Sequence, residues 1–337
     1  MRAAVLRGPG DVAVEERPVP QPGQGEVVVR VRSVGVCGSD SHYYEHGRIG
    51  RFVVEEPLVL GHEAAGEVTE VGPGVTRLTV GQRVSIEPGV PDLTCEQCLA
   101  GRYNLCPNMR FFATPPFDGA LAEYVVVHEA FAHPVPENVS DDAAALLEPL
   151  SVGIWACGKA RVTAGDRVLV TGAGPIGLVC VQAALAFGAT EVVVSDVNPA
   201  RLALAKELGA TEVVDARETR VSDLPRPPRV LLECSGYAPA IAEGIRALDR
   251  AGRAVLVGMG SDEVALPLPV VQERELELVG TFRYANTWPT AIALVASGRI
   301  DLDRLVTGTY RLDQTEEALT AGRRDPQSVK AVVRPQT

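Results

Sequence analysis

The 337-residue sequence contains no run of Lys and Arg, and its 43 acidic residues outnumber its 32 basic residues. The resulting net charge of −11 argues against a broad surface for nucleic-acid phosphates. Internal repeats and low-complexity segments are also absent. We therefore expect a globular protein, long enough for two domains of about 100–200 residues each.

Cysteines are few and odd in number: there are seven, three of them within residues 95–106. The first residues, MRAAVLRGPG, contain no secretion signal. Both observations argue against disulfides and favour a reducing cytoplasm. Cys157, Cys180 and Cys234 lie in apolar contexts, and we expect them to be buried packing residues.

Long uncharged runs are scarce as well. Residues 168–190 contain no charge, and a membrane helix needs about 20 such residues. Gly172, Gly174, Pro175 and Gly177 interrupt this run. We therefore expect a buried strand, a turn and a helix rather than a membrane span.

The second half of the chain alternates short apolar runs with helical patterns. The runs predict six strands, at residues 167–172, 191–196, 212–216, 229–234, 253–258 and 276–282. Strands that alternate with helices predict an α/β fold in which helices cover both faces of a parallel sheet. Six strands of this kind fit a doubly wound Rossmann domain.

The first half of the chain has a different pattern. EVVVRVRSVG (26–35), AGEVTEVG (65–72) and QRVSIE (82–87) are separated by Gly- and Pro-rich turns. This pattern predicts an antiparallel, β-rich domain whose loops carry function. We expect this β-rich domain over residues 1–150, the Rossmann domain over residues 151–282, and over residues 283–337 a C-terminal segment too small to form a domain of its own.

GAGPIG at residues 172–177 is a G-x-G-x-x-G motif that follows a predicted strand and opens a helix. Gly172 permits a tight turn, Gly174 a close approach of the backbone to a pyrophosphate, and Gly177 close helix–strand packing. Asp196 ends the next strand, where its carboxylate can accept hydrogen bonds from the ribose hydroxyls and repel a 2′-phosphate. The motif therefore favours NAD, although Arg201 nearby could accommodate the phosphate of NADP.

DLTCEQCLAGRYNLC (92–106) places three cysteines in a C-x2-C-x7-C pattern that is typical of a metal site. Tetrahedral zinc needs a fourth ligand, which the pattern alone leaves open. Further upstream, Cys37, His62 and Glu63 are also of the types that bind zinc. Their linear spacing does not decide whether they meet.

Several segments, in order, resemble the zinc-dependent medium-chain dehydrogenase/reductase superfamily: GVCGSD (35–40), GHEAAGEVTEVG (61–72) and GAGPIG (172–177). More specific segments resemble the group of sorbitol (L-iditol 2-), xylitol and arabinitol dehydrogenases: SHYYEHGRIG, GRYNLCP, FFATPPFDG, LLEPLSVG and FRYANTWP. The likeness runs almost end to end. It implies a GroES-like catalytic domain, to which the C-terminal segment returns, and a Rossmann domain. It also implies NAD and zinc as cofactors, a polyol/ketose substrate pair, and a homo-oligomer, commonly a tetramer.

The resemblance also implies roles for individual residues. Cys37, His62 and Glu63 would bind a catalytic zinc, and Glu148 would act catalytically, with direct ligation of the zinc left open. Asp92 stands at the first position of the superfamily's C-x2-C-x2-C-x7-C pattern, so Asp92, Cys95, Cys98 and Cys106 would form a structural zinc site. Some relatives lack this second site, so an empty loop is the alternative.

Further residues would serve the substrate and the cofactor. Ser39 resembles the hydroxyl of a proton relay. The substrate pocket would be lined by Tyr43, Phe111, Glu148, Arg283 and Tyr284. Along the cofactor, besides the residues of the glycine motif, the resemblance and the strand ends place Ile176, Val257, Gly258, Met259, Thr281, Phe282 and Arg283.

Two other functions are compatible with the fold. One is a zinc- and NAD-dependent dehydrogenase of another polar alcohol, such as threonine, glucose, arabinitol or an aminocyclitol precursor. The other is a non-catalytic dinucleotide-binding protein, which would be expected to have lost its zinc ligands. All the expected ligands are present, which argues against the non-catalytic protein. FRYANTWP resembles the polyol group in its Arg-Tyr pair and counts against another alcohol, so the polyol dehydrogenase is the favoured interpretation.

Overall fold

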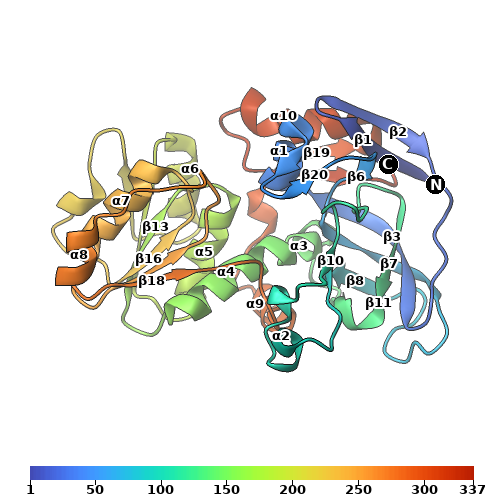
Figure 1. Ribbon diagram of the computed structural model, residues 1–337, viewed down its shortest axis with the longest axis horizontal. Helices are drawn as coiled ribbons and strands as arrows, with labels where there is room; N and C mark the ends of the chain where they lie inside the picture. Colours follow the sequence, from blue (N-terminus) through green and yellow to red (C-terminus); the bar gives the residue numbers. More distant parts are fainter. The chain divides into compact units, whose positions relative to one another are not determined.

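The computed structural model describes all residues, 1–337, and divides into two compact units. Unit 1 comprises Met1–Glu148, Trp288–Ala296 and Leu302–Thr337, and unit 2 comprises Pro149–Thr287 and Ser297–Asp301. Figure 1 shows the elements of both units. None of the helices combines the length and the hydropathy that a membrane span requires.

Unit 1 is β-rich. Its strands are β1 (Arg2–Gly8), β2 (Asp11–Glu16), β3 (Glu26–Gly35), β4 (Arg48–Ile49), β5 (Phe52–Val53), β6 (Leu58–Val59), β7 (Glu63–Val71), β8 (Arg83–Ile86), β9 (Gly89–Val90), β10 (Arg110–Phe111), β11 (Tyr124–His128), β12 (Ala132–Pro134), β19 (Val306–Arg311) and β20 (Lys330–Arg334). Its helices are α1 (Gly38–His46), α2 (Glu96–Leu99), α3 (Asp141–Ala145), α9 (Trp288–Ala296) and α10 (Thr315–Arg324).

A seven-stranded sheet forms the centre of unit 1, in the order β12-β8-β7-β3-β20-β19, with β11 also paired to β3. All its pairs are antiparallel except β19 with β20. The predicted strand over residues 26–35 matches β3 at both ends, because Gly/Pro-rich turns bound a valine-rich run. The predicted antiparallel, β-rich architecture is thus confirmed.

The core of unit 1 consists of the apolar residues of this sheet and of β1, many of them fully buried, such as Leu6, Val29 and Ile86. Apolar residues of α10 and β20, near the C-terminus, also belong to this core. Trp288 of α9 is fully buried and its Nε1 donates to Ser85 Oγ at 2.9 Å. Burying apolar side chains of this size contributes about 1.5–3 kcal/mol each, so the returning segment stabilises unit 1.

Unit 2 is a Rossmann domain. Its six strands are all parallel, in the order β15-β14-β13-β16-β17-β18. They are β13 (Arg167–Thr171), β14 (Glu191–Asp196), β15 (Glu212–Asp215), β16 (Val230–Glu233), β17 (Arg253–Leu256) and β18 (Glu277–Gly280). The helices are α4 (Leu147–Ala160), which starts at the end of the first segment of unit 1, α5 (Pro175–Ala186), α6 (Pro199–Glu207), α7 (Ala238–Ala247) and α8 (Leu268–Glu273).

This topology confirms the predicted doubly wound sheet, and every predicted strand is present. The chain first forms β13-β14-β15 on one side and then β16-β17-β18 on the other, so the strand order reverses between β13 and β16. Such a switch point is where dinucleotides bind in this fold. Residues 297–301 belong to unit 2 because Gln182 exchanges two hydrogen bonds with the backbone of Asp301, at 2.7 and 3.0 Å.

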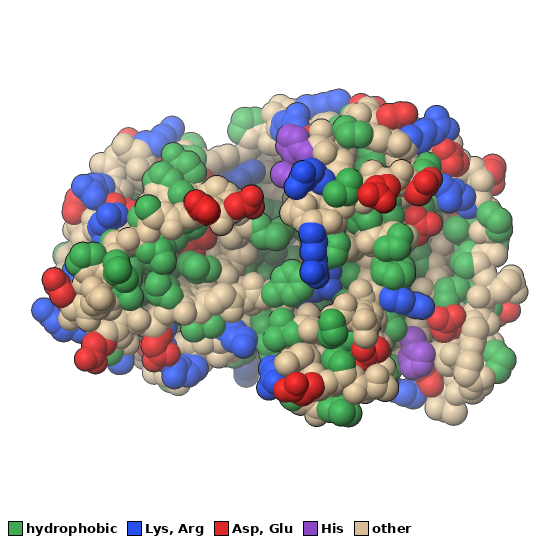
Figure 2. Space-filling view, viewed as in Figure 1, with side chains coloured by type: hydrophobic (Ala, Val, Ile, Leu, Met, Phe, Trp, Pro, Cys, Tyr) green, Lys and Arg blue, Asp and Glu red, His purple; other side chains and the backbone are tan.

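The surface charges agree with the composition. Acidic and basic side chains are interspersed over the face shown in Figure 2, without a broad basic area there.

Candidate metal and cofactor sites

Unit 1 brings Cys37, His62 and Glu63 together, with one potential ligand atom of each within 4.8 Å of the others. Cys37 is the N-cap of α1, His62 immediately precedes β7, and Glu63 is the first residue of β7. The antiparallel pairing of β3 with β7 sets Gly35 opposite Glu63, so the segment leading to Cys37 passes beside the other two donors. A thiolate, an imidazole and a carboxylate form a donor set that zinc accepts.

Gly35 leaves the space that the Glu63 carboxylate occupies. A Cβ at this position would lie 2.1 Å from Glu63 Oε2 and 2.9 Å from Cδ2 of Leu146. Real Cβ atoms do not make such short contacts, so glycine is required here for steric reasons. The strand that supports the site is therefore shaped around one of the donors.

Asp40 ties the donor-bearing segments together. Its side chain is buried; Oδ2 accepts from the Cys37 N–H and Oδ1 from the Gly61 N–H, both at 2.9 Å. His62 Nδ1 lies 3.6 Å from Asp40 Oδ1. A carboxylate beside the imidazole of a metal-binding histidine fixes the orientation of the ring.

The electrostatics of the cluster favour a cation. Burial alone would lower the pKa of His62, but the charges of Asp40 and Cys37 raise it well above its usual value of 6.5. Burial would likewise raise the pKa of Asp40, yet His62 and the backbone N–H groups lower it. The metal-free cluster thus attracts a positive charge, and its residues fit a zinc ion, which would displace that proton.

The residues of unit 1 that are expected to be catalytic are Ser39 and Glu148, and those expected to line the substrate pocket include Tyr43 and Phe111. The ring centroids of Phe111 and His62 are 5.6 Å apart, and Tyr43 is a buried residue of α1. Ser39 is half-buried in the first turn of α1. Glu148 is buried in the first turn of α4, outside the group of donors that lie within 4.8 Å of one another.

One charged neighbour of this cluster, Lys330, was not predicted from the sequence. Lys330 in β20 is buried and its Nζ donates to both carboxylate oxygens of Glu63 at 2.8 Å. Burial would lower the pKa of Lys330, but Glu63, Cys37 and Glu148 raise it, so the ammonium stays charged. The sequence signal was slight: one lysine in an otherwise apolar run, KAVV.

A second cluster of donors lies in the loop before and around α2. Asp92, Cys95, Cys98 and Cys106 each bring a ligand atom within 4.8 Å of the others. Cys95 caps α2 through a 3.4 Å contact from the Cys98 N–H, and its Sγ lies 3.4 Å from that of Cys98. Three thiols and a carboxylate fill a tetrahedral zinc site, so the residues fit a closed, structural ion.

Local hydrogen bonds hold Asp92 in its place. Oδ1 accepts from the N–H groups of Cys95 and Thr94 at 2.9 Å, and Oδ2 from the Asn108 amide at 2.7 Å. These bonds, that of Cys95 first, lower the pKa of Asp92, which keeps it an anion. Burial and the neighbouring thiols raise the pKa of Cys98 to about 12, so this thiol stays protonated without a metal. Zinc would replace that proton.

The glycine motif in unit 2 forms the expected turn between β13 and α5. Gly172 has φ +88, and a Cβ on Gly177 would lie 1.8 Å from Gly172 O, so both positions require glycine. Gly174 is the N-cap of α5, and the space beside its Cα is open. The motif therefore forms a cradle with the helix N-terminus free to face a phosphate, which fits a dinucleotide.

Asp196 lies at the end of β14 beside this turn. Its Oδ2 accepts from the Ala173 N–H at 2.6 Å and its Oδ1 from the Asn198 N–H at 2.8 Å. The carboxylate is therefore fixed next to the glycine turn, where the ribose of a dinucleotide is recognised in this fold. Arg201 is half-buried in the first turn of α6.

The remaining expected cofactor residues all belong to unit 2. Half-buried positions are Ile176, Val257, Gly258, Thr281 and Arg283, and exposed ones are Met259 and Phe282. Tyr284, which is expected to bind substrate, also belongs to unit 2 and is buried. The N–H groups of Val257 and Gly258 both donate to Glu233 O at 2.8 Å, which fixes the loop after β17. Arg283, with φ +52, stacks its guanidinium 4.8 Å from the Phe282 ring centroid.

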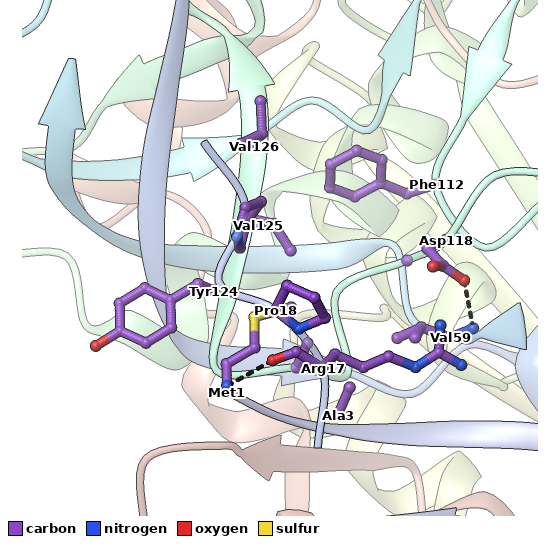
Figure 3. A pocket seen from close by; sticks show the side chains of 13 residues that line it. Met1, Ala3, Arg17, Pro18, Val59, Phe112, Asp118, Tyr124, Val125 and Val126 are labelled. Atoms are coloured by element: carbon purple, nitrogen blue, oxygen red, sulfur yellow. Dashed lines mark hydrogen bonds between the residues drawn. The ribbon is translucent and has the colours of Figure 1, made fainter. Parts of the chain in front are cut away.

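A separate pocket of about 340 Å³ lies elsewhere in unit 1 and is shown in Figure 3. Val59, Phe112 and Val125 contribute to its apolar lining, and Arg17 and Asp118 are among its polar residues. None of the donors of either metal cluster lines it. It is therefore distinct from the candidate catalytic site.

Comparison with known proteins matches two family descriptions to the chain. "Alcohol dehydrogenase GroES-like domain" covers residues 23–137 and "Zinc-binding dehydrogenase" covers residues 175–297. The sorbitol dehydrogenase of Bos taurus is 46% identical over 95% of this chain and 92% of its own length. That of Gallus gallus is 47% identical over 96% and 93%.

Solved structures with the same fold include cofactor complexes. An Escherichia coli CFT073 protein, described as a short chain alcohol dehydrogenase, in complex with NADH superposes with a TM-score of 0.93 at 30% identity. The superposition covers 99% of this chain and 99% of that chain. A protein of Sinorhizobium meliloti 1021, named as a zinc-binding dehydrogenase and bound to NADP, gives a TM-score of 0.92 at 31% identity, with 99% of both chains covered.

Proposed function

Because this chain belongs to the zinc-binding, medium-chain dehydrogenase family that includes the sorbitol dehydrogenases, we propose that it interconverts a polyol and a 2-ketose with NAD. The observation that carries the proposal is the meeting of Cys37, His62 and Glu63 within 4.8 Å. Three protein donors leave a fourth position of a tetrahedral zinc for a ligand from outside, as catalytic zinc sites do. A protein that only binds dinucleotides has no need of such a site.

The cofactors supply the chemistry that side chains lack. Bound zinc supplies a Lewis acid that favours loss of a proton from a substrate hydroxyl, and NAD supplies the hydride acceptor. The chain binds and orients these groups. Cys37, His62 and Glu63 hold the metal, and Asp40 keeps the imidazole of His62 in its orientation.

Polar side chains near the metal donors would handle the proton and the hydroxyl groups. Ser39 lies two residues after Cys37, where its hydroxyl can pass a proton from the substrate towards solvent. Glu148 offers a buried carboxylate that can accept hydrogen bonds from a polyol. Phe111 forms an apolar wall beside His62 and excludes water from the reacting carbon.

The dinucleotide would lie along the glycine turn of unit 2. Asp196 selects NAD over NADP, because its fixed carboxylate accepts hydrogen bonds from the ribose hydroxyls and repels a 2′-phosphate. Arg283 and Tyr284 are the substrate-binding residues of unit 2 in the proposal, since the donors of a guanidinium and a phenol suit a substrate with several hydroxyl groups better than they suit ethanol. Asp92, Cys95, Cys98 and Cys106 hold a zinc that stabilises the loop and takes no part in the reaction.

A panel of substrates tests this function. The purified protein is incubated with NAD or NADP and with D-sorbitol, xylitol, ethanol or L-threonine, and NADH or NADPH formation is followed at 340 nm. Turnover of the polyols with NAD, and little with ethanol or threonine, is expected. Preferential turnover of threonine, or no turnover of any polyol by zinc-loaded protein, would refute the polyol assignment.

The proposal extends to the state of the protein in the cell, where we expect a homotetramer in the cytoplasm. All seven cysteines are free thiols in the structure, which fits a reducing compartment. Sedimentation velocity of the zinc-loaded protein, which yields the mass of the assembly in solution, tests the tetramer.

A further inference from the structure

Lys330 is a cation buried in β20, with 2% of its surface exposed. Its ammonium group has three N–H donors. Two of them reach Glu63 Oε1 and Oε2 at 2.8 Å, and the third reaches Val36 O at 3.0 Å. All three donors are therefore used within the protein.

The position of these bonds links two of the proposed zinc ligands. Val36 immediately precedes Cys37, and its N–H donates to Ala331 O at 2.9 Å. Two consecutive residues of β20 thus bind Val36: Ala331 accepts from its N–H and Lys330 donates to its C=O. Lys330 also donates to Glu63, so β20 joins the segments that carry Cys37 and Glu63.

Lys330 and a zinc ion would compete for the Glu63 carboxylate. Zinc and Lys330 are both cations, and both would draw on the single Glu63 carboxylate, which is 1% exposed. A carboxylate has about four lone-pair positions, and Lys330 takes two of them. At an effective dielectric constant suited to protein sites, a unit charge a few ångströms from a metal changes its binding by more than about tenfold.

We propose that Lys330 is a positioning residue that shares the Glu63 carboxylate with the catalytic zinc and so keeps the Glu63–zinc bond weak. The zinc then retains more positive charge and an open position for the substrate hydroxyl. This inference rests on the proposed zinc site and deepens it. A purely structural ion pair would have the opposite signature, because its loss would loosen the site and weaken metal binding.

The sign of the change in metal affinity tests the proposal. K330M removes the competing cation without shortening the side chain much, and metal affinity at the catalytic site is measured by competition with a chromophoric chelator. We expect K330M to bind zinc about tenfold or more tightly than the unaltered protein. K330R keeps the charge and is expected to bind zinc within about threefold of the unaltered protein.

The coordination itself can be read with Co²⁺ in the catalytic site. We expect the visible absorption of the Co²⁺ protein to lose intensity in K330M, because a released carboxylate raises the coordination number. We also expect K330M to turn over polyol about tenfold more slowly although its metal is held more tightly. Weaker zinc binding in K330M, or a Co²⁺ spectrum identical to that of the unaltered protein, would overturn the proposal.

Two further variants separate folding and function from this effect. K330Q keeps a hydrogen-bond donor and serves the same comparison if K330M yields no folded protein. In an E63Q background, K330M is expected to tighten zinc less than it does beside Glu63, because no carboxylate is released. Equal tightening in both backgrounds would contradict the shared carboxylate. Metal affinity and the Co²⁺ spectrum need no substrate, so a wrong polyol assignment leaves these results readable.

Discussion

Replacing Gly35 by alanine is the sharpest structural test of the catalytic metal site. Gly35 lies in β3, opposite Glu63 in β7. The added Cβ would lie 2.1 Å from Glu63 Oε2, so the carboxylate has to move. We expect G35A to displace Glu63 and thereby lose zinc from the catalytic site while the cluster around α2 keeps its ion.

The expected loss of stability in G35A follows from the contacts that hold the Glu63 carboxylate. An ordinary contact requires Glu63 to shift by about 1 Å or more, against a closely packed interior. Overpacking of this kind costs about 1–3 kcal/mol. The shift also weakens charge-assisted bonds to Lys330, each worth about 1.5–3 kcal/mol. We therefore expect the free energy of unfolding to fall by roughly 3–5 kcal/mol.

The assay combines zinc content with stability. Atomic absorption should show a fall from about two zinc ions per chain to about one, and urea denaturation should show the loss of stability. G38A is the matched control, since nothing lies within 4 Å of a Cβ built on Gly38, next to Cys37. G38A should keep both ions and change the unfolding free energy by less than about 1 kcal/mol. A G35A protein with full zinc content and stability would refute the reasoning.

Three other perturbations probe separate parts of the molecule. D92A removes the fourth donor of the cluster around α2, so zinc content should fall to about one ion per chain while D92C restores it; a D92A protein with two ions would show that Asp92 is not a ligand. D196A should lower kcat/KM for NAD by about tenfold or more and that for NADP much less, because hydrogen bonds to a charged group are lost; an equal fall for both cofactors would contradict ribose recognition. Burial raises the pKa of Glu123, but bonds from the Arg2 N–H and guanidinium lower it below 4.5 overall. A depressed folded-state pKa stabilises the protein above the unfolded-state value of 4.5, and the gain is lost as the pH falls from there through the lower folded-state pKa. The stability difference between the unaltered protein and E123Q should therefore shrink from pH 7 to pH 3 in urea titrations; a constant difference would show that the ion pair does not respond to acid.

Much of the architecture could be predicted because local patterns and tertiary structure agree. The six strands of unit 2 each read as a short apolar run between turn residues, and the glycine motif follows the first of them. Likewise, β3 is bounded by Gly25 and Gly35, and both of its ends were predictable. Local signals of this kind need no knowledge of distant residues.

The assembly of the catalytic metal site could not be predicted in the same way. Cys37 and Glu63 meet through the register of β3 against β7, which sequence spacing does not specify. The demand for glycine at position 35 appears only when the Glu63 carboxylate is placed beside it. Lys330 is separated from Glu63 by 267 positions, and a lysine in an apolar strand would usually be assigned to solvent.

The cluster around α2 shows the opposite case. Asp92, Cys95, Cys98 and Cys106 lie within one short loop, so their spacing alone brings the donors close together. Even there, the hydrogen bonds that hold Asp92, such as that from Asn108, depend on the folded loop. Short-range metal patterns are therefore predictable, whereas their supporting contacts are not.

The most direct test of the central claim is removal and return of the catalytic zinc during polyol oxidation. The purified protein is treated with a chelator until one zinc remains per chain, and NADH formation from D-sorbitol is followed before and after zinc is added back. We predict that activity disappears with the first ion lost and returns in proportion to the zinc restored, and that C37S never regains it. Full polyol oxidation by protein depleted of the ion at Cys37, His62 and Glu63 would contradict the account.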